Sequence, residues 1–154
     1  MIIRPYQPED AAALAQIFYD AVHYGTASHY TPAQRRAWAP LCPTAEVWAA
    51  RLQGLTTFVA ASPHPAGFMS LRADGYLDLA FVAPDQQGRG AGSALHAAVL
   101  AHARSLTLDS LKVEASLAAH AFFLRHGWQE LARQTISRHG EAIENFRMQR
   151  FTLK

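Results

Sequence analysis

A glycine-rich stretch near the middle of the chain has the residue types that bind a phosphate group. Its sequence is Gln87-Gly88-Arg89-Gly90-Ala91-Gly92, followed by Ser93. Glycine allows a positive φ and lets a ligand come close to the main chain. The apolar run 76–82 before the stretch predicts a strand, and residues 93–103 after it predict a helix. The free N–H groups and the dipole of that helix would favour an anion, so the stretch predicts a phosphate-binding turn.

Three phosphate-binding motifs compete for this turn. A P-loop needs a Gly-Lys pair, which the chain lacks. A dinucleotide-binding fingerprint needs Gly-x-Gly-x-x-Gly, whereas the glycines here are spaced two apart. The third motif, Gln-x-x-Gly-x-Gly, is satisfied by Gln87, Gly90 and Gly92. It resembles the pyrophosphate-binding motif of the GNAT superfamily, the coenzyme A-dependent N-acetyltransferases.

A second block, residues 116–128, resembles a later motif of the same superfamily. In that motif an Asn is followed by an Ala, an aromatic pair and a closing Gly-aromatic pair. The residues that match in register are Ala119, Phe122, Phe123, Gly127 and Trp128. Gly127 also suits the left-handed residue that ends a helix. The resemblance covers roughly residues 55–151, while the first 50 residues fit the layout without a strict motif.

Composition limits the classes of protein to consider. The chain has 154 residues, which predicts one domain over 1–154, and its formal charge is +2 with no basic run, so nucleic acid is not expected. The single cysteine, Cys42, excludes an internal disulfide, and no His-x-x-x-His pair predicts a metal site. No apolar stretch approaches the roughly 20 residues that span a membrane. Without a signal peptide at Met1, we expect a cytoplasmic protein, and a homodimer is compatible with these features.

The predicted elements follow the order of the GNAT layout. Strands are expected at 2–5, 57–60, 67–72, 76–82 and 110–115, and a final hairpin at 128–137 and 142–151. Helices are expected at 8–22, 31–38, 44–53, 93–103 and 118–126, with a loop over 23–30. The resemblance therefore implies an α+β fold with three layers: a mixed, twisted sheet of about seven strands, with helices on both faces.

The resemblance also implies where acetyl-CoA would bind. Residues 87–93 would hold the pyrophosphate, and the backbone near Phe81 and Val82 would pair with the pantetheine arm. A backbone N–H there can also stabilise the oxyanion. The hydroxyl of Ser116, which replaces the usual Asn, can form one hydrogen bond to the cofactor, and Phe123 belongs to the same site.

Asp78 is the first candidate for the general base that takes a proton from the amine. Aspartate is disfavoured within strands, and alternation places Asp78 on the face opposite Leu77, Leu79 and Phe81. An acid at this point is similar to the family's usual general base, which often works through water. Glu114, at the end of the neighbouring strand, is the second candidate.

The general acid is where the chain departs from the family. The second residue of the aromatic pair is commonly a Tyr, but here it is Phe123, which cannot donate a proton. The candidates that replace it are His120, His126 and Tyr30. The sequence leaves the choice open, with water as a further source of the proton.

Rings and hydroxyls cluster in the segment that lines the acceptor pocket in relatives of the family. His29, Tyr30 and Trp38 are the residues expected to contact the acceptor, next to His23 and Tyr24. Such side chains offer apolar faces and polar tips, which suit a small amine or a peptide terminus.

The sequence therefore predicts an N-acetyltransferase that moves the acetyl group of acetyl-CoA directly to a primary amine. A non-catalytic acyl-CoA-binding module is the alternative that the missing tyrosine suggests. A nucleotide-binding protein that uses the same turn is a weaker third interpretation.

Overall fold

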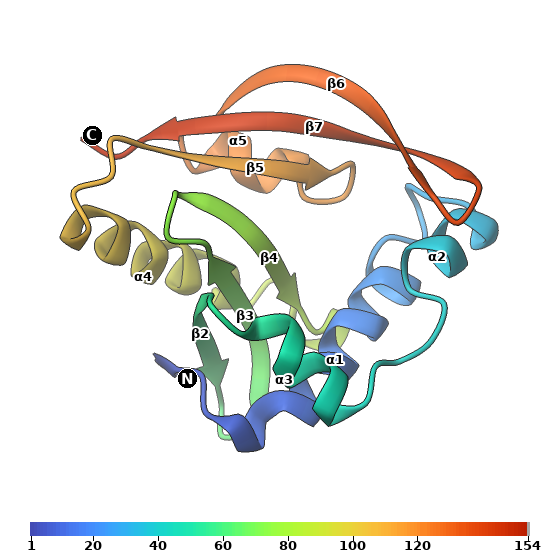
Figure 1. Cartoon of the computed structure of the whole chain (residues 1–154), viewed down its shortest axis with the longest axis horizontal. Coiled ribbons are helices and arrows are strands. Elements are labelled where there is room, and N and C mark those ends of the chain that lie inside the picture. The colour runs from blue at the N-terminus through green and yellow to red at the C-terminus, as the bar shows by residue number, and fades with distance from the viewer. Residues whose placement is uncertain (154) are drawn as a thin grey trace.

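The computed structural model describes residues 1–153, which form a seven-stranded mixed sheet (Figure 1). Along the sheet the strands have the order β1-β2-β3-β4-β5-β7-β6. Only β4 and β5 are parallel, and every other pair is antiparallel. The predicted α+β fold is confirmed. The strands are β1 (Ile2–Pro5), β2 (Thr56–Ala61), β3 (Pro65–Leu71), β4 (Tyr76–Val82), β5 (Ser110–Ser116), β6 (Gln129–Arg138) and β7 (Glu141–Phe151).

Helices cover both faces of the sheet. They are α1 (Ala11–Asp20), α2 (Pro32–Trp38), α3 (Ala45–Leu52), α4 (Ala91–Ser105) and α5 (His120–Arg125). The Thr31 and Thr44 hydroxyls accept hydrogen bonds from the backbone at the starts of α2 and α3, as N-cap residues do.

The predicted loop over 23–30 is wrong for its first residues. A π-helical turn, Ala21–Gly25, continues α1 instead. Ala21 and Val22 stay buried, and the Thr26 hydroxyl donates to the Val22 carbonyl over 2.5 Å, which closes the end of the helix. The ring-rich composition of the segment did not reveal the helical turn, because the turn is stabilised by burial of its apolar side chains against the rest of the fold.

Two apolar cores lie on the two sides of the sheet. Leu95, Val99 and Phe123 belong to the core between the sheet and helices α4 and α5. The second core includes Leu14 of α1 and Trp48 of α3, which pack against the other face. Burying each such side chain contributes about 1.5–3 kcal/mol, so the two cores hold the three layers together.

Strand β4 contains a bulge at Asp78. Ser70 of β3 lies opposite Leu79 and Leu71 lies opposite Leu77, which leaves Asp78 as an extra residue. Leu77 therefore packs in the core beside α4, whereas Leu79 packs in the core beside α1 and α3. The predicted strict alternation along this strand is wrong here, because an extra residue shifts the pleat.

The parallel strands β4 and β5 pair only at their beginnings. The paired positions are Tyr76 with Lys112 and Leu77 with Val113, and beyond them the strands diverge (Figure 1). The facing edges of the two strands thus carry backbone N–H and C=O groups without the ladder partners that an intact sheet would supply. A ligand chain can take those partners' place.

His96 is a buried histidine held neutral inside the core. It is 3% exposed, and the indole Nε1–H of Trp128 donates to its Nε2 over 2.8 Å. An Nε2 that accepts a hydrogen bond carries no proton. Burial, with smaller effects from His126 and Arg150, lowers the pKa of His96 to about 4.

We expect the protein to lose stability in mild acid because of His96. Between about pH 6.5 and about pH 4 the unfolded chain protonates this ring and the folded chain does not, so the free energy of unfolding falls as the pH falls. A shift from 6.5 to about 4 corresponds to roughly 3 kcal/mol. Urea unfolding across this range measures the effect. In the variant His96→Gln the amide oxygen can still accept from Trp128, and the free energy of unfolding should depend less on pH than in wild type. The same pH dependence in both proteins would contradict this account.

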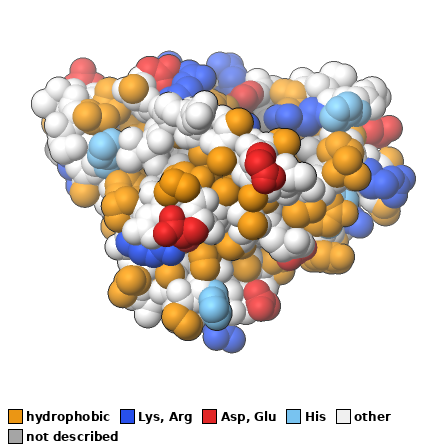
Figure 2. Space-filling model, turned by 60° about the horizontal axis from the view of Figure 1, so that its bottom comes forward, with side chains coloured by type: hydrophobic (Ala, Val, Ile, Leu, Met, Phe, Trp, Pro, Cys, Tyr) orange, Lys and Arg blue, Asp and Glu red, His pale blue; other side chains and the backbone are white. Residues whose placement is uncertain are grey.

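Charged groups of both signs are interspersed with apolar side chains on the face that Figure 2 shows. That face therefore presents no extended area of one charge. Within residues 1–153, no helix combines the length and the apolar character that a bilayer crossing requires.

Candidate active site

Two cavities lie where the strands β4 and β5 diverge. The first, here called the carboxylate cavity, has a volume of about 210 Å³ and contains Asp78 and Glu114 in its lining. The second, the turn cavity, has a volume of about 380 Å³ and is lined by the glycine-rich turn. The residues that line both cavities are Trp38, Ala80, Phe81, Ser116, Ala119 and Phe123. The two cavities therefore meet at the diverging strands.

The turn cavity has the backbone that an anion needs. Gly88 and Gly90 have φ values of +79° and +87°, and Gly90 is the N-cap of α4. The helical hydrogen bonds begin at Ala94, whose N–H donates to the Gly90 carbonyl over 3.1 Å. The preceding N–H groups of the first turn are thus available to a ligand.

Most of the predicted cofactor residues line this cavity. They are Phe81, Val82, Gln87, Gly88, Gly90, Ala91, Gly92, Ser93, Ser116 and Phe123. Arg89 is exposed and lies outside the lining. A basic residue that the sequence interpretation missed, Arg125, lines the cavity from the last turn of α5. Its place two residues before Gly127, within the second motif, was the available signal.

Gly92 lets α5 pack against the start of α4. A Cβ atom at this position would lie 3.0 Å from the ring of Phe122, which is closer than nearly all side-chain contacts in proteins. Gly92 therefore lets the glycine-rich turn and the block 116–128, which are distant in sequence, line the turn cavity together.

Ser116 sits where the two cavities join. Its Oγ accepts a hydrogen bond from the N–H of Ala119 over 3.1 Å, which leaves the hydroxyl hydrogen to donate elsewhere. Beside it, the edge of β4 at Ala80–Val82 faces the turn cavity. A ligand with amide groups can bond to this edge as an added strand would.

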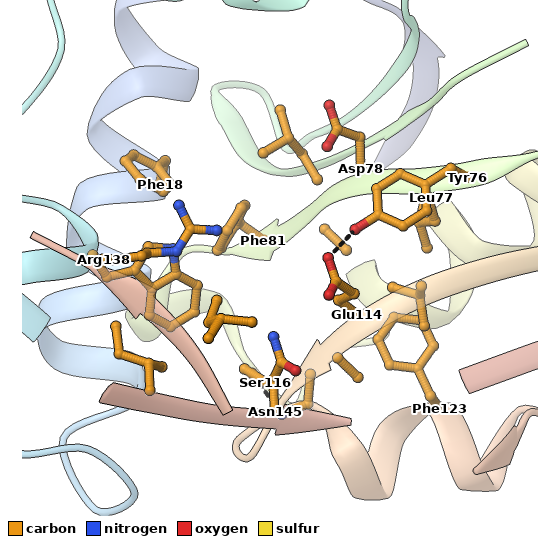
Figure 3. A pocket seen from close by; sticks show the side chains of 18 of the residues that line it. Phe18, Tyr76, Leu77, Asp78, Phe81, Glu114, Ser116, Phe123, Arg138 and Asn145 are labelled. Atoms are coloured by element: carbon orange, nitrogen blue, oxygen red, sulfur yellow. Dashed lines mark hydrogen bonds between the residues drawn. The ribbon is translucent and has the colours of Figure 1, made fainter. Parts of the chain in front are cut away.

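The two carboxylates of the carboxylate cavity have different partners, and Figure 3 shows the bond between Tyr76 and Glu114. Asp78 Oδ2 accepts from Arg51 over 2.7 Å in an ion pair. Glu114 accepts from two neutral donors, the Tyr76 hydroxyl at 2.9 Å and the Gln134 side-chain amide. Burial and the bond to Glu114 raise the pKa of Tyr76, so this hydroxyl keeps its proton and continues to donate. Asp78 is thus engaged by a cation, whereas the bonds to Glu114 come from uncharged groups.

Tyr30 and Trp38 both line the carboxylate cavity, together with Asp78. Their rings meet edge to face with centroids 5.7 Å apart. The Tyr30 hydroxyl donates to the Glu144 carbonyl over 2.6 Å and accepts from the Leu117 N–H over 2.9 Å. Burial raises the pKa of Tyr30, and the proton is already engaged in a bond to the backbone. The geometry favours a positioning role for Tyr30 over proton donation.

We expect Tyr30→Phe to weaken the fold more than the chemistry. It leaves the Leu117 N–H without its partner, which should lower the free energy of unfolding by about 1–3 kcal/mol. The fall in kcat should be much smaller than the roughly 10²- to 10⁴-fold loss that follows removal of a general acid. Thermal unfolding and steady-state kinetics on the same preparation measure both. A large fall in kcat with unchanged stability would restore Tyr30 as the proton donor.

The remaining predicted polar residues lie outside both cavity linings. His29 is exposed, with its Nδ1 3.2 Å from the Ser28 hydroxyl. His120 pairs with Glu130 over 2.6 Å and stacks on Phe146. His126 donates from Nδ1 to the Phe122 carbonyl, and its Nε2 lies 3.0 Å from the Ser93 hydroxyl. None of these rings points to a general acid in the cavities.

Comparison with known proteins identifies this arrangement. The model of the acetyltransferase (GNAT) domain matches residues 26–150. The chain belongs to the GNAT acetyltransferase family. It is 36% identical over 147 residues to YafP of Escherichia coli K12, an uncharacterized N-acetyltransferase, covering 95% of this chain and 93% of that protein.

Solved structures agree with this assignment. A GCN5-related N-acetyltransferase from Rhodopseudomonas palustris is 36% identical, with a TM-score of 0.91 and coverage of 97% of this chain and 94% of that one. A putative acetyltransferase from Salmonella typhimurium, solved with its cofactor acetyl-CoA, shares the fold at 19% identity, with a TM-score of 0.73 and coverage of 100% and 95%. The prediction of a GNAT enzyme that uses acetyl-CoA as its acetyl donor is confirmed at the level of the family.

Proposed function

We propose that this acetyltransferase transfers the acetyl group of acetyl-CoA directly to the primary amine of a small molecule or peptide, with Glu114 as the general base. The observation that carries the proposal is the meeting of the two cavities at Ala80, Phe81 and Ser116. A thioester that enters from the turn cavity and an amine that enters from the carboxylate cavity would come together there.

The parts of the reaction follow from this arrangement. The neutral amine nitrogen attacks the thioester carbonyl carbon, a C–N bond forms, and the C–S bond breaks. Glu114 takes the proton that the nitrogen loses, directly or through a water molecule. A backbone N–H on the free edge of β4 stabilises the negative charge that develops on the carbonyl oxygen. Because no side chain has been assigned as general acid, the leaving thiolate takes its proton from water.

Acetyl-CoA itself fits the turn cavity by its chemistry. Its pyrophosphate suits the N–H groups of the first turn of α4, with Arg125 as a nearby cation. Its pantetheine amides suit the edge at Ala80–Val82. The cytoplasmic location and the homodimer that the sequence suggested remain predictions.

A panel of amines, amino acids and short peptides tests the proposal. Release of free thiol from acetyl-CoA is followed with and without each acceptor. At least one amine should raise thiol release well above the hydrolysis background. Stabilisation by acetyl-CoA with no acceptor-dependent release would instead favour a non-catalytic acyl-CoA-binding module.

A further inference from the structure

Arg138 is an exposed cation at the carboxylate cavity that forms no ion pair within residues 1–153. It lines the cavity from the end of β6, and no residue in 1–153 forms an ion pair or hydrogen bond with its guanidinium. The other cation in the lining, Arg51, is already paired with Asp78. A guanidinium presents a planar set of donors that matches a carboxylate.

The hairpin that carries Arg138 is fixed in place. His139 Nδ1 donates to the Ala37 carbonyl of α2 over 2.8 Å. On the other strand, the side-chain amide of Gln34 donates to the Ala142 carbonyl over 2.9 Å. The hairpin end is thus anchored to α2 on both sides of its turn. Arg138 is therefore presented from a positioned backbone, which reduces the ordering cost of binding a ligand.

Asn145 adds an amide with an unpaired oxygen to the same cavity. The residue is 7% exposed, and its Oδ1 has no hydrogen-bond partner within residues 1–153. It lines the cavity from β7, and in the view of Figure 3 its amide lies between Arg138 and Glu114. A buried amide oxygen without a donor is costly unless a ligand supplies one. The amine of a ligand can donate to this oxygen.

The charges of the cavity describe the ligand that would complement it. Arg51 and Asp78 compensate each other over 2.7 Å. Arg138 and Glu114 remain, one of each sign, and in the view of Figure 3 they enter from opposite sides. The complementary ligand carries an amine for Glu114 and an anion for Arg138.

We propose that the acceptor is a free amino acid, whose carboxylate is bound by Arg138 while its amine faces Glu114 and the Oδ1 of Asn145. This inference rests on the proposed function and names the class of its acceptor. The volume of about 210 Å³ suits a single small molecule rather than a folded partner. The rest of the lining includes Phe18, Ile136 and Ile143, which favours an apolar side chain on the acceptor.

Matched acceptors that differ in the carboxylate test the inference. Phenylalanine is compared with 2-phenylethylamine, and leucine with 3-methylbutylamine, while a dipeptide serves as an extended acceptor. Each is tested with wild type, Arg138→Gln and Arg36→Gln. The control removes the same charge from an exposed α2 residue outside both cavity linings. Thiol release gives kcat/KM, and calorimetry in the presence of coenzyme A gives binding without turnover.

We expect wild type to prefer the amino acid of each pair by about 10- to 100-fold in kcat/KM, as a charge-assisted bidentate contact would provide. Arg138→Gln should remove that preference by raising KM for the amino acid, while Arg36→Gln keeps it. Equal use of both members of each pair, or a preference unchanged in Arg138→Gln, would overturn the inference and leave the proposed function intact. Carboxylate-selective binding that depends on Arg138 but is followed by no turnover would support an amino-acid site at Arg138, and it would contradict both the proposed function and the role of that amino acid as acceptor. Absence of both selective binding and turnover for the whole panel would overturn both.

Discussion

Replacing Glu114 by Gln is expected to lower kcat by about 10²- to 10⁴-fold, the usual effect of removing a general base. The substitution keeps the length of the side chain, and its amide oxygen can still accept from the Tyr76 hydroxyl, which now bonds to Glu114 over 2.9 Å. It cannot take a proton from the amine. Acetyl-CoA binding should be little changed, because Glu114 lines the carboxylate cavity and lies outside the lining of the turn cavity. Steady-state kinetics at saturating acetyl-CoA measures the effect.

Asp78→Asn is the matched control for this prediction. It removes the other carboxylate of the same cavity and breaks the ion pair with Arg51. We expect a fall in kcat far smaller than that for Glu114→Gln, since the base would remain. A larger loss of kcat in Asp78→Asn than in Glu114→Gln would show that Asp78, the first candidate from the sequence, is the general base.

Gly90→Val is expected to abolish stabilisation of the fold by acetyl-CoA. At 100 times its dissociation constant, a ligand adds about 2.7 kcal/mol to the free energy of unfolding, which raises Tm by roughly 5–10 °C for a chain of this size. Gly90 has a φ of +87° at the N-cap of α4. A branched side chain strains that backbone and places atoms where the ligand must approach the N–H groups. Differential scanning fluorimetry with and without acetyl-CoA measures the shift.

Gly54→Val controls for backbone strain in that experiment. Gly54 also has a positive φ, +79°, and a Cβ atom added there would meet no heavy atom within 4 Å, as at Gly90. It lies between α3 and β2 and outside both cavity linings. This variant should have a lower Tm but keep the shift caused by acetyl-CoA. A full shift in Gly90→Val would show that the cofactor does not bind at this turn.

The parts of the site that local sequence determines could be predicted. The glycine turn needs positive φ at Gly88 and Gly90, and the apolar periodicity on each side specifies a strand and a helix. Their order in the chain then follows the layout of the family. For this reason the fold was predicted, and ten of the eleven residues predicted to bind the cofactor line the turn cavity, Arg89 being the exception. Their contact with the cofactor stays a prediction, and Arg125 in the same lining was not foreseen.

The parts that depend on pairing between distant segments could not be predicted. The bulge at Asp78 exists only in the register of β3 against β4. The two acids differ in their hydrogen-bond partners, and these partners come from distant segments. Arg51 of α3 donates to Asp78, and Gln134 of β6 donates to Glu114. Arg138 likewise reaches the cavity because its hairpin is fixed to α2. No spacing within a single segment contains that information.

Mass spectrometry with isotopically labelled acetyl-CoA tests direct transfer to an amine most directly. The protein is mixed with labelled acetyl-CoA and the best acceptor, and acceptor, thiol and intact protein are analysed at short times. Direct attack predicts one labelled acetyl group on the acceptor for each free thiol and no acetylated protein as an intermediate. The one cysteine of the chain, Cys42, is exposed and outside both cavity linings, so it offers no nucleophile there. Thiol release without acetylated acceptor, or an acetyl-protein that forms and decays before the product, would contradict the account.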